Sequence, residues 1–273
     1  MGPYPRTDRS APLITVRGEV PDVELAVLRD DMVEGLSHPA KGVLESEALT
    51  VALRTVPRHE FVPAEPEVAY ADKAFDHEGS TVLAPSTVAS LLEALDLEAG
   101  QEVLVVGAGV GYTVAVIAEV VGGRHVSAID LSRPLVYEAR RNLGTTGYGE
   151  VLVDRGDGAR GLPGYAPFDR ILVEAAAIEP PAALCDQLAP GGKLVLPLGA
   201  SDQALAAVGP GGEVLDTHGG VRFKPLLVEG EQAGGIERNR TDREERERAI
   251  RAAERRRGWE QEWIDWDRAG GLR

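Results

Sequence analysis

The sequence predicts an α/β protein with a Rossmann-like, doubly wound and mostly parallel sheet, helices before that sheet and a helical extension after it. From Glu102 onward, short apolar runs alternate with segments of helical periodicity, which indicates parallel strands joined by right-handed crossovers. Val103–Val106 is wholly apolar and runs into glycines, as expected of a strand that is buried on both faces. Residues 24–36 have the apolar spacing of a helix that precedes the sheet.

The other elements follow the same two periodicities in chain order. A second helix over 46–55 ends before Pro57, because the residue before a proline disfavours helix. A proline-containing irregular stretch and a loop around 78–80 come next, and a further helix begins after Pro85. Beyond Val106 we expect helices over 113–121, 133–143 and 182–188, strands over 125–129, 149–153, 168–173 and 193–197, and two or three strands within 203–228.

Composition shifts divide the chain into three parts. Residues 1–22 contain prolines and arginines without the apolar run of a secretory signal, so we expect a loose arm. Residues 23–230 form the main domain, with a helical, substrate-binding part over 23–100 and a cofactor-binding sheet over 101–230. Residues 231–273 form a charged extension that contains all the tryptophans.

The charge and the reactive side chains exclude several classes of protein. A net charge of −15 argues against nucleic acid as the main partner, because phosphate binding needs a basic face. The single cysteine, Cys185, allows no internal disulfide, which fits a cytoplasmic protein, and the five histidines have no metal-ligand spacing. No apolar run approaches the roughly 20 residues of a membrane helix. Only four of the basic residues are lysines, which favours a salt-adapted protein, although a merely acidic protein is the alternative.

The extension has two distinct patterns. Residues 241–257 are dense in charges of both signs, which predicts an exposed helix with ion pairs at helical spacing. Trp259, Trp263 and Trp266 follow at positions that share one helical face. We expect this face to dock on the protein's own core, and a surface for a partner or a homodimer is the alternative interpretation.

The loop Gly107–Tyr112 follows the first buried strand and leads into a helix. Glycines there allow a tight turn and close approach of a ligand, and the free N–H groups of the helix start can bind polar groups. Dinucleotide loops have the pattern G-x-G-x-x-G, whereas the third glycine here is Gly111 and the sixth position is Tyr112. The G-x-G-x-G spacing resembles the S-adenosylmethionine loop of class I methyltransferases, and a purely structural glycine-rich turn is the alternative. The predicted contacts are Gly107, Ala108, Gly109, Gly111 and Tyr112.

Two acidic residues follow the next two strands. Asp130 ends a strand about 20 residues past the loop, where a carboxylate can accept both ribose hydroxyls, with Leu131 beside it. Asp157 and Gly158 follow the third strand, and in methyltransferases a polar residue at this point meets the adenine amino group. The alternatives are a helix N-terminal role for Asp130 and an Asp-Gly turn at Asp157.

Several stretches resemble the protein-L-isoaspartate O-methyltransferase family. They are Val-Pro-Arg-His-Glu-Phe-Val-Pro over 56–63, 69–72, 79–85, the glycine loop, 156–158, 166–171, 175–177, 188–193 and 221–226. The resemblance covers roughly 31–228, and the extension lies outside the family pattern. It implies S-adenosylmethionine as cofactor and a repair reaction, in which a protein or peptide substrate is methylated on the carboxylate of an L-isoaspartyl or D-aspartyl residue. The ionised carboxylate needs no strong base, so positioning is the main demand.

The sequence departs from this family at three polar positions. The resemblance implies a serine at Leu83, an acid at Val105 and a threonine at Glu174. We therefore name no catalytic residue, and take Ser80 and Thr81 as candidates for the missing hydroxyl.

The acceptor side of the site follows from the same resemblance. We expect Thr81, Ala84, Pro85 and Glu174 to bind the substrate, with Ser86 as another source of the hydroxyl. Glu174 places negative charge near a carboxylate substrate, which is unfavourable unless it is paired or protonated. A different methyl acceptor, and a non-catalytic module that recruits a partner through its extension, are the alternative functions. A dehydrogenase is a more distant one.

Overall fold

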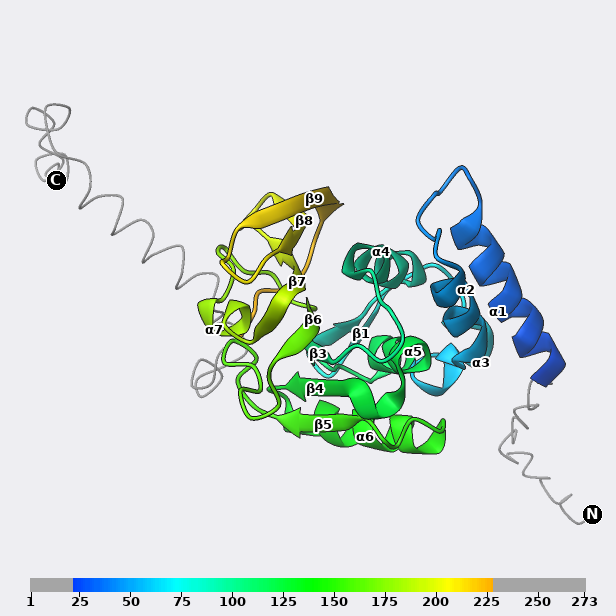
Figure 1. Ribbon diagram of the computed structural model, residues 1–273. Helices are drawn as coiled ribbons and strands as arrows, with labels where there is room; N and C mark the ends of the chain where they lie inside the picture. Colours follow the sequence, from blue (N-terminus) through cyan, green and yellow to red (C-terminus); the bar gives the residue numbers. More distant parts are fainter. Residues whose placement is uncertain (1–21, 228–273) are drawn as a thin grey trace, which may run out of the picture.

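The structure is a computed structural model and describes residues 22–227 (Figure 1). The predicted arm before Asp22, the charged helix over 241–257 and the tryptophans of the extension lie outside the described residues. None of the described helices is long and apolar enough to cross a membrane.

The core of the described region is a seven-stranded sheet with the order β5-β4-β3-β6-β7-β8-β9. The first five strands in this order are parallel, and β8 and β9 add antiparallel strands at one edge. Their bounds are β3 Val103–Val106, β4 Val126–Asp130, β5 Leu152–Arg155, β6 Phe168–Val173, β7 Leu188–Leu198, β8 Gln203–Val208 and β9 Val214–Val221. The predicted Rossmann-like α/β fold is confirmed.

Helices surround this sheet, and the N-terminal ones form a separate layer (Figure 1). Their bounds are α1 Asp22–Ser37, α2 Glu47–Thr55, α3 Pro66–Ala69, α4 Pro85–Leu95, α5 Tyr112–Val121, α6 Arg133–Thr145 and α7 Ala182–Cys185, with short 3₁₀ turns over Arg58–Glu60 and Gly123–His125. Helix α2 begins where Ser46 caps it, since the Ser46 hydroxyl accepts the Leu49 N–H at 3.3 Å. Pro85 occupies the first turn of α4, where its missing N–H leaves no bond unmade.

The side chains of the central strand β3 pack alternately into two hydrophobic clusters. Val103 and Val105 pack in the cluster that contains α1, α2, α4, α5 and α6, whereas Leu104 and Val106 pack with α7 and the far face. All four side chains are essentially inaccessible to solvent. Both faces of the central strand β3 are therefore covered.

The structure corrects four details of the sequence prediction. The strand expected over 149–153 is β5 at Leu152–Arg155, whose polar end fits an edge strand. The helix expected over 182–188 is the single turn α7. Strand β7 begins at Leu188, before Pro190, because a bulge at this point brings Gly192 against the carbonyls of β6. The loop expected around 78–80 is the turn of a hairpin, β1 Phe75–His77 and β2 Ser80–Val82.

Candidate functional site

A cavity of about 350 Å³ lies at the carboxyl ends of the parallel strands. Its wall combines the ends of β3, β4 and β6, the start of α6, the turn of the β1–β2 hairpin and the segment after β9. Ligands of open α/β sheets bind at this edge. Six of the predicted site residues line the cavity: Ser80, Gly107, Asp130, Leu131, Gly158 and Glu174.

The glycine loop joins β3 to α5, and Gly107 at its start lies on the cavity wall. Gly107, Gly109 and Gly111 all have positive φ, at 98°, 52° and 94°, so each occupies backbone space that other residues rarely adopt. A Cβ at Gly107 would lie 3.3 Å from the Glu174 Cβ, so the glycine also allows β3 and β6 to approach at their ends. A Cβ at Gly158 would overlap the side chain of Val106. Gly107 and Gly158, which line the cavity, thus leave the backbone there uncovered by side chains.

Asp130 ties the glycine loop to the next helix. Its Oδ2 accepts the Gly109 N–H at 3.0 Å, and its Oδ1 accepts the Ser132 N–H at 2.8 Å at the start of α6. Burial raises the pKa of this carboxyl, and the backbone N–H groups oppose that rise. Asp130 thus lines the cavity and also fills the helix N-terminal role that the sequence left open.

Glu174 follows β6, beside the glycine loop. Its N–H donates to the Val106 carbonyl at 2.9 Å, which fixes the backbone, and the residue is half-buried. Its Oε1 is sealed from solvent and has no hydrogen-bond partner among the described residues. Burial raises the pKa of Glu174 to about 7, a hydrogen bond from the Thr113 hydroxyl lowers it, and the Asp130 charge raises it further. A buried, unpartnered carboxylate oxygen needs an external donor or a proton.

The carboxylates give the cavity its electrostatic character. Glu78, Asp130 and Glu174 line it, and Lys224 is the one lysine or arginine among the described lining residues. The Lys224 ammonium is turned towards the hairpin, where it donates to the Gly79 carbonyl at 3.1 Å. The cavity therefore suits a ligand that carries positive charge and disfavours a pyrophosphate.

Comparison with known proteins assigns the family. The family model described as Protein-L-isoaspartate(D-aspartate) O-methyltransferase matches residues 29–231. This chain belongs to that family. A protein-L-isoaspartate O-methyltransferase from Aeropyrum pernix is 44% identical over 207 residues, which are 72% of this chain and 78% of the relative. One from Methanosarcina mazei is 42% identical over 188 residues, 68% of this chain and 76% of the relative.

Solved structures of the same family share the fold. A protein-L-isoaspartate O-methyltransferase structure superposes with a TM-score of 0.64 at 28% identity, covering 72% of this chain and 65% of that one. The Plasmodium falciparum β-aspartate methyltransferase, in complex with S-adenosyl-L-homocysteine, superposes with a TM-score of 0.62 at 22% identity, covering 72% and 97%.

Other residues predicted to bind the cofactor do not line the cavity. They are Ala108, Gly109, Gly111, Tyr112 and Asp157. The Tyr112 ring is buried below the Arg58 guanidinium, whose central carbon lies 4.5 Å from the ring centroid. The Asp157 Oδ1 accepts the Ala159 N–H at 2.9 Å, which is the Asp-Gly turn of the alternative interpretation.

The acceptor residues predicted from the family are divided between the hairpin and α4. The Ser80 residue lines the cavity, whereas the Thr81 hydroxyl donates to Asp76 Oδ1 at 3.4 Å across the hairpin. Ala84 and Pro85 form the start of α4 beside the cavity, and Ser86 lines a different hollow. The Leu83 carbonyl accepts a hydrogen bond from Arg58 at 2.6 Å. Ser80 is thus the hydroxyl candidate that the fold brings to the cavity.

Sequence reasoning missed the contacts that hold the hairpin over the cavity. His77 Nε2 lies 2.8 Å from Glu138 Oε2 of α6 on one side of the hairpin. Lys224 lies 3.7 Å from Asp76 Oδ1 on the other, besides its bond to the Gly79 carbonyl. Lys224 stands within the family-like segment 221–226, so this segment was the one signal in the sequence that pointed to it.

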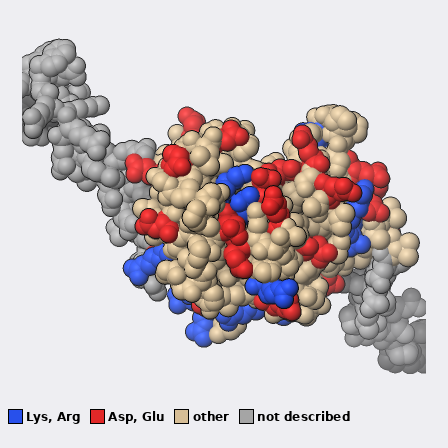
Figure 2. Space-filling model, in the orientation of Figure 1, with Lys and Arg blue, Asp and Glu red and all other residues tan. Residues whose placement is uncertain are grey.

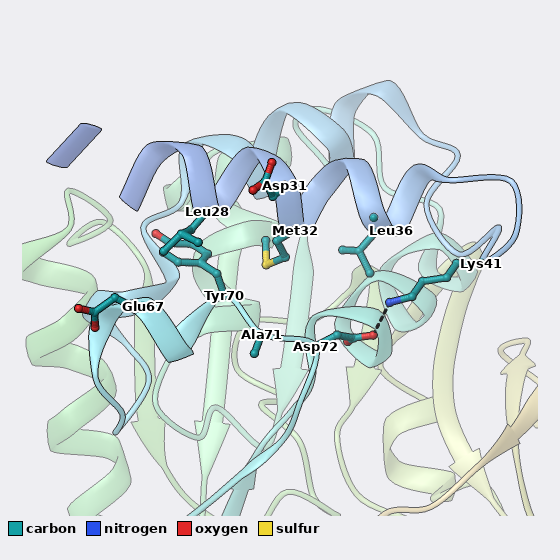
Figure 3. Close-up of a pocket in the computed structure, with 10 residues that line it drawn as sticks. Leu28, Asp31, Met32, Leu36, Lys41, Glu67, Tyr70, Ala71 and Asp72 are labelled. Atoms are coloured by element: carbon teal, nitrogen blue, oxygen red, sulfur yellow. Dashed lines mark hydrogen bonds and ion pairs between the residues drawn. The ribbon is translucent and has the colours of Figure 1, made fainter. Parts of the chain in front are cut away.

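A second cavity of about 390 Å³ lies between α1 and the segment after α3 (Figure 3). Met32 and Leu36 form part of its apolar wall, and at one end the Lys41 ammonium lies 2.7 Å from Asp72 Oδ2. The Asp72 Oδ1 also accepts the Ser86 N–H at 2.9 Å, so this carboxylate fixes the start of α4. The two cavities share no lining residue.

Proposed function

We propose that this chain transfers a methyl group from S-adenosylmethionine to the carboxylate of L-isoaspartyl or D-aspartyl residues in damaged proteins and peptides. The observation that carries the proposal is the acid-lined cavity at the strand ends, with Gly107 of the glycine loop on its wall. S-Adenosylmethionine carries a sulfonium and an ammonium, so it complements this charge, whereas a dinucleotide would bring two phosphates beside three carboxylates. Membership of the family supplies the acceptor class.

The residues of the cavity fit this cofactor. Asp130 keeps unused lone pairs on both carboxylate oxygens after its two backbone bonds, so it can also accept ribose hydroxyls. The positive φ of Gly107 and the absence of a side chain there leave the backbone open to a ligand. Glu174 adds an acidic residue to the wall beside the glycine loop. Leu131 and Leu135 provide apolar wall on the β4 side of the cavity for the adenosine.

The chemistry makes modest demands on the protein. When bound, S-adenosylmethionine supplies an electrophilic methyl group, and its transfer forms a carbon–oxygen bond to the carboxylate, breaks the carbon–sulfur bond and leaves that electron pair on sulfur. No proton moves in this step. The chain's own residues therefore need to orient the carboxylate and to exclude water. The hairpin turn and Ser80 at the start of β2 line the cavity, and Ser80 can donate a hydrogen bond to the acceptor.

A pair of peptides tests the proposal. One carries a single isoaspartyl residue and the other the normal aspartyl residue, and both are incubated with the enzyme and methyl-labelled S-adenosylmethionine. Methyl ester on the isoaspartyl peptide alone is expected. Tight cofactor binding without any methyl transfer would contradict the acceptor assignment.

A methyltransferase with another acceptor is the second proposed function. Glu174 favours it, because a buried carboxylate in the cavity repels a carboxylate substrate more than a neutral or cationic one. A screen of protein, RNA and small-molecule acceptors with labelled cofactor separates the two functions. Labelling that is confined to the isoaspartyl peptide rejects the second one.

We propose further that the protein works in the cytoplasm of a salt-adapted cell. The net charge of −15 and the low lysine content support this, and Figure 2 shows acidic side chains spread over much of one face. The paired-peptide assay at low and at high salt tests it. Higher activity in high salt is expected, and loss of activity there contradicts the proposal.

For the domain organisation, we propose that 23–230 is the catalytic domain, with a substrate part over 23–100, and that 1–22 and 231–273 are appendages. The tryptophans of the extension support either docking on this domain or a homodimer, and recruitment of another protein through them is the non-catalytic alternative. Deletion of 231–273 tests these interpretations. Loss of a dimer or complex with intact cofactor binding supports an interface, and unfolding supports internal docking.

A further inference from the structure

We propose that Glu174 binds the ammonium group of the cofactor's methionine moiety. This role rests on the proposed function, because it assumes S-adenosylmethionine in the cavity. It goes beyond it by assigning a contact to a residue at which this chain departs from the family pattern.

The position of Glu174 in the sheet selects the amino-acid end of the cofactor. Asp130 ends β4 and Glu174 follows β6, with β3 and the glycine loop between them. Two strand spacings separate the two sites by about 10 Å. If Asp130 accepts the ribose hydroxyls, a ligand that crosses the glycine loop presents its sulfonium near Gly107 and its amino-acid end near Glu174. Asp130 and Glu174 thus face the ribose and the amino-acid end of one extended cation.

Hydrogen bonding favours the ammonium rather than the sulfonium as the partner of Glu174. This residue lines the cavity, and a carboxylate that loses water when a ligand fills the cavity needs an N–H or O–H donor. An ammonium has three N–H donors and can satisfy it, whereas a sulfonium has no N–H or O–H to donate. A carboxylate acceptor also lacks such a donor and would add like charge. The ammonium is therefore the group of the reacting pair that meets both the charge and the hydrogen-bonding need of Glu174.

Other charged groups of the cavity are less suited to this contact. Asp130 is engaged with Gly109 and Ser132 at the ribose side. Glu78 is on the hairpin turn at the rim, beside the Lys224 that donates to Gly79. Among the acids that line the cavity within the described chain, Glu174 is the one that adjoins the glycine loop on the β6 side.

Calorimetric titration of the full chain with three ligands tests the assignment. S-Adenosylmethionine has sulfonium and ammonium, S-adenosylhomocysteine has the ammonium alone, and 5′-methylthioadenosine has neither. Glu174→Gln is expected to weaken the first two by a similar factor of about 10 to 100, the range of a charge-assisted hydrogen bond, and to leave methylthioadenosine within about twofold. Glu98→Gln, which removes one exposed carboxylate away from the cavity, is the matched control and should change none of them.

A second variant keeps the proposal testable if Glu174→Gln does not fold. Glu174→Asp keeps the charge but draws it back by one methylene, so it should weaken the two amino-acid ligands by a smaller factor and spare methylthioadenosine. Weaker binding of S-adenosylmethionine alone would assign the residue to the sulfonium and overturn the proposal. An equal loss for all three ligands, or no loss, would also overturn it.

The same titrations separate this inference from the proposed function. A native protein that binds none of the three ligands refutes both. If the titrations give the expected ligand pattern but the native protein labels no isoaspartyl peptide, only the acceptor assignment is refuted. If the native protein labels the isoaspartyl peptide and Glu174→Gln binds S-adenosylhomocysteine normally, only the proposed role of Glu174 is refuted.

Discussion

Glu174→Gln is expected to stabilise the ligand-free protein at alkaline pH, although Glu174 lies in the cavity. The pKa of this carboxyl rises from its ordinary value of 4.5 to about 7 on folding, mainly through burial. The folded protein therefore binds the proton more tightly than the unfolded chain. A carboxyl with a raised pKa contributes its full stability below pH 4.5, and that contribution is lost as the pH rises to about 7.

The magnitude follows from the same two values. A pKa that rises from 4.5 to about 7 on folding means that ionisation of Glu174 lowers the unfolding free energy by about 3 kcal/mol at pH 8, as an order of magnitude. Glutamine resembles the protonated side chain in shape and cannot ionise. The unfolding free energy of the variant should thus exceed that of the native protein by less than about 1 kcal/mol at pH 5 and by about 3 kcal/mol at pH 8.

Urea unfolding of both proteins at pH 5, 6, 7 and 8 measures this difference. Asp130, whose pKa is also raised by burial, is present in both proteins, so the cost of its own burial cancels, while its coupling to the Glu174 charge is part of the measured difference. The Glu98→Gln protein serves as the control for loss of one negative charge, because that side chain is exposed. A difference that stays constant from pH 5 to 8, or a Gln variant that is less stable at pH 8, would refute the reasoning about burial of Glu174.

Three further predictions follow from single contacts. Asp130→Asn should weaken S-adenosylhomocysteine by about 10- to 100-fold in calorimetry, because the ribose hydroxyls and the Gly109 N–H lose a charged acceptor; unchanged affinity would move the ribose elsewhere. Arg58→Met should lower the unfolding free energy by about 3 kcal/mol in urea, since the buried guanidinium serves two backbone carbonyls, and a loss below about 1 kcal/mol would contradict this. Ser80→Ala should lower kcat/KM for an isoaspartyl peptide by about tenfold while Ser86→Ala does not, and the opposite order would exchange their roles.

The sheet was predictable because its signals are local. Val103–Val106 is buried on both faces, and an all-apolar run that leads into glycines encodes such a strand. The hairpin strands Phe75–His77 and Ser80–Val82 are too short to show an alternation. The bulge before Gly192 was hidden for another reason. A Pro-Gly-Gly run normally ends an element, and only the close approach of β6 explains why the strand continues through it.

The cavity was predictable only where the chain itself brings residues to the strand ends. Gly107 and Asp130 are on the wall because Gly107 directly follows β3 and Asp130 is the last residue of β4. Lys224 and Gly79 are 145 positions apart, so no local pattern indicates their contact. The direction of a side chain is equally hidden. Tyr112 stands next to the glycine loop in sequence, but its ring turns away into the core below Arg58.

The register of β3 and β6 explains how the cavity keeps an acid although Val105 is apolar. Val105 pairs with Leu172, and both side chains point to the face that packs against α5. Glu174 is two residues beyond Leu172 and directly follows β6, so it continues on the same face but lies at the cavity rather than in the core. A carboxylate at position 105 would be deep in the apolar cluster, whereas at 174 it is within reach of both the ligand and Thr113. The negative charge of Glu174 is thus at the cavity rather than inside the apolar cluster, which lowers its cost in the free protein and leaves it available to a cation.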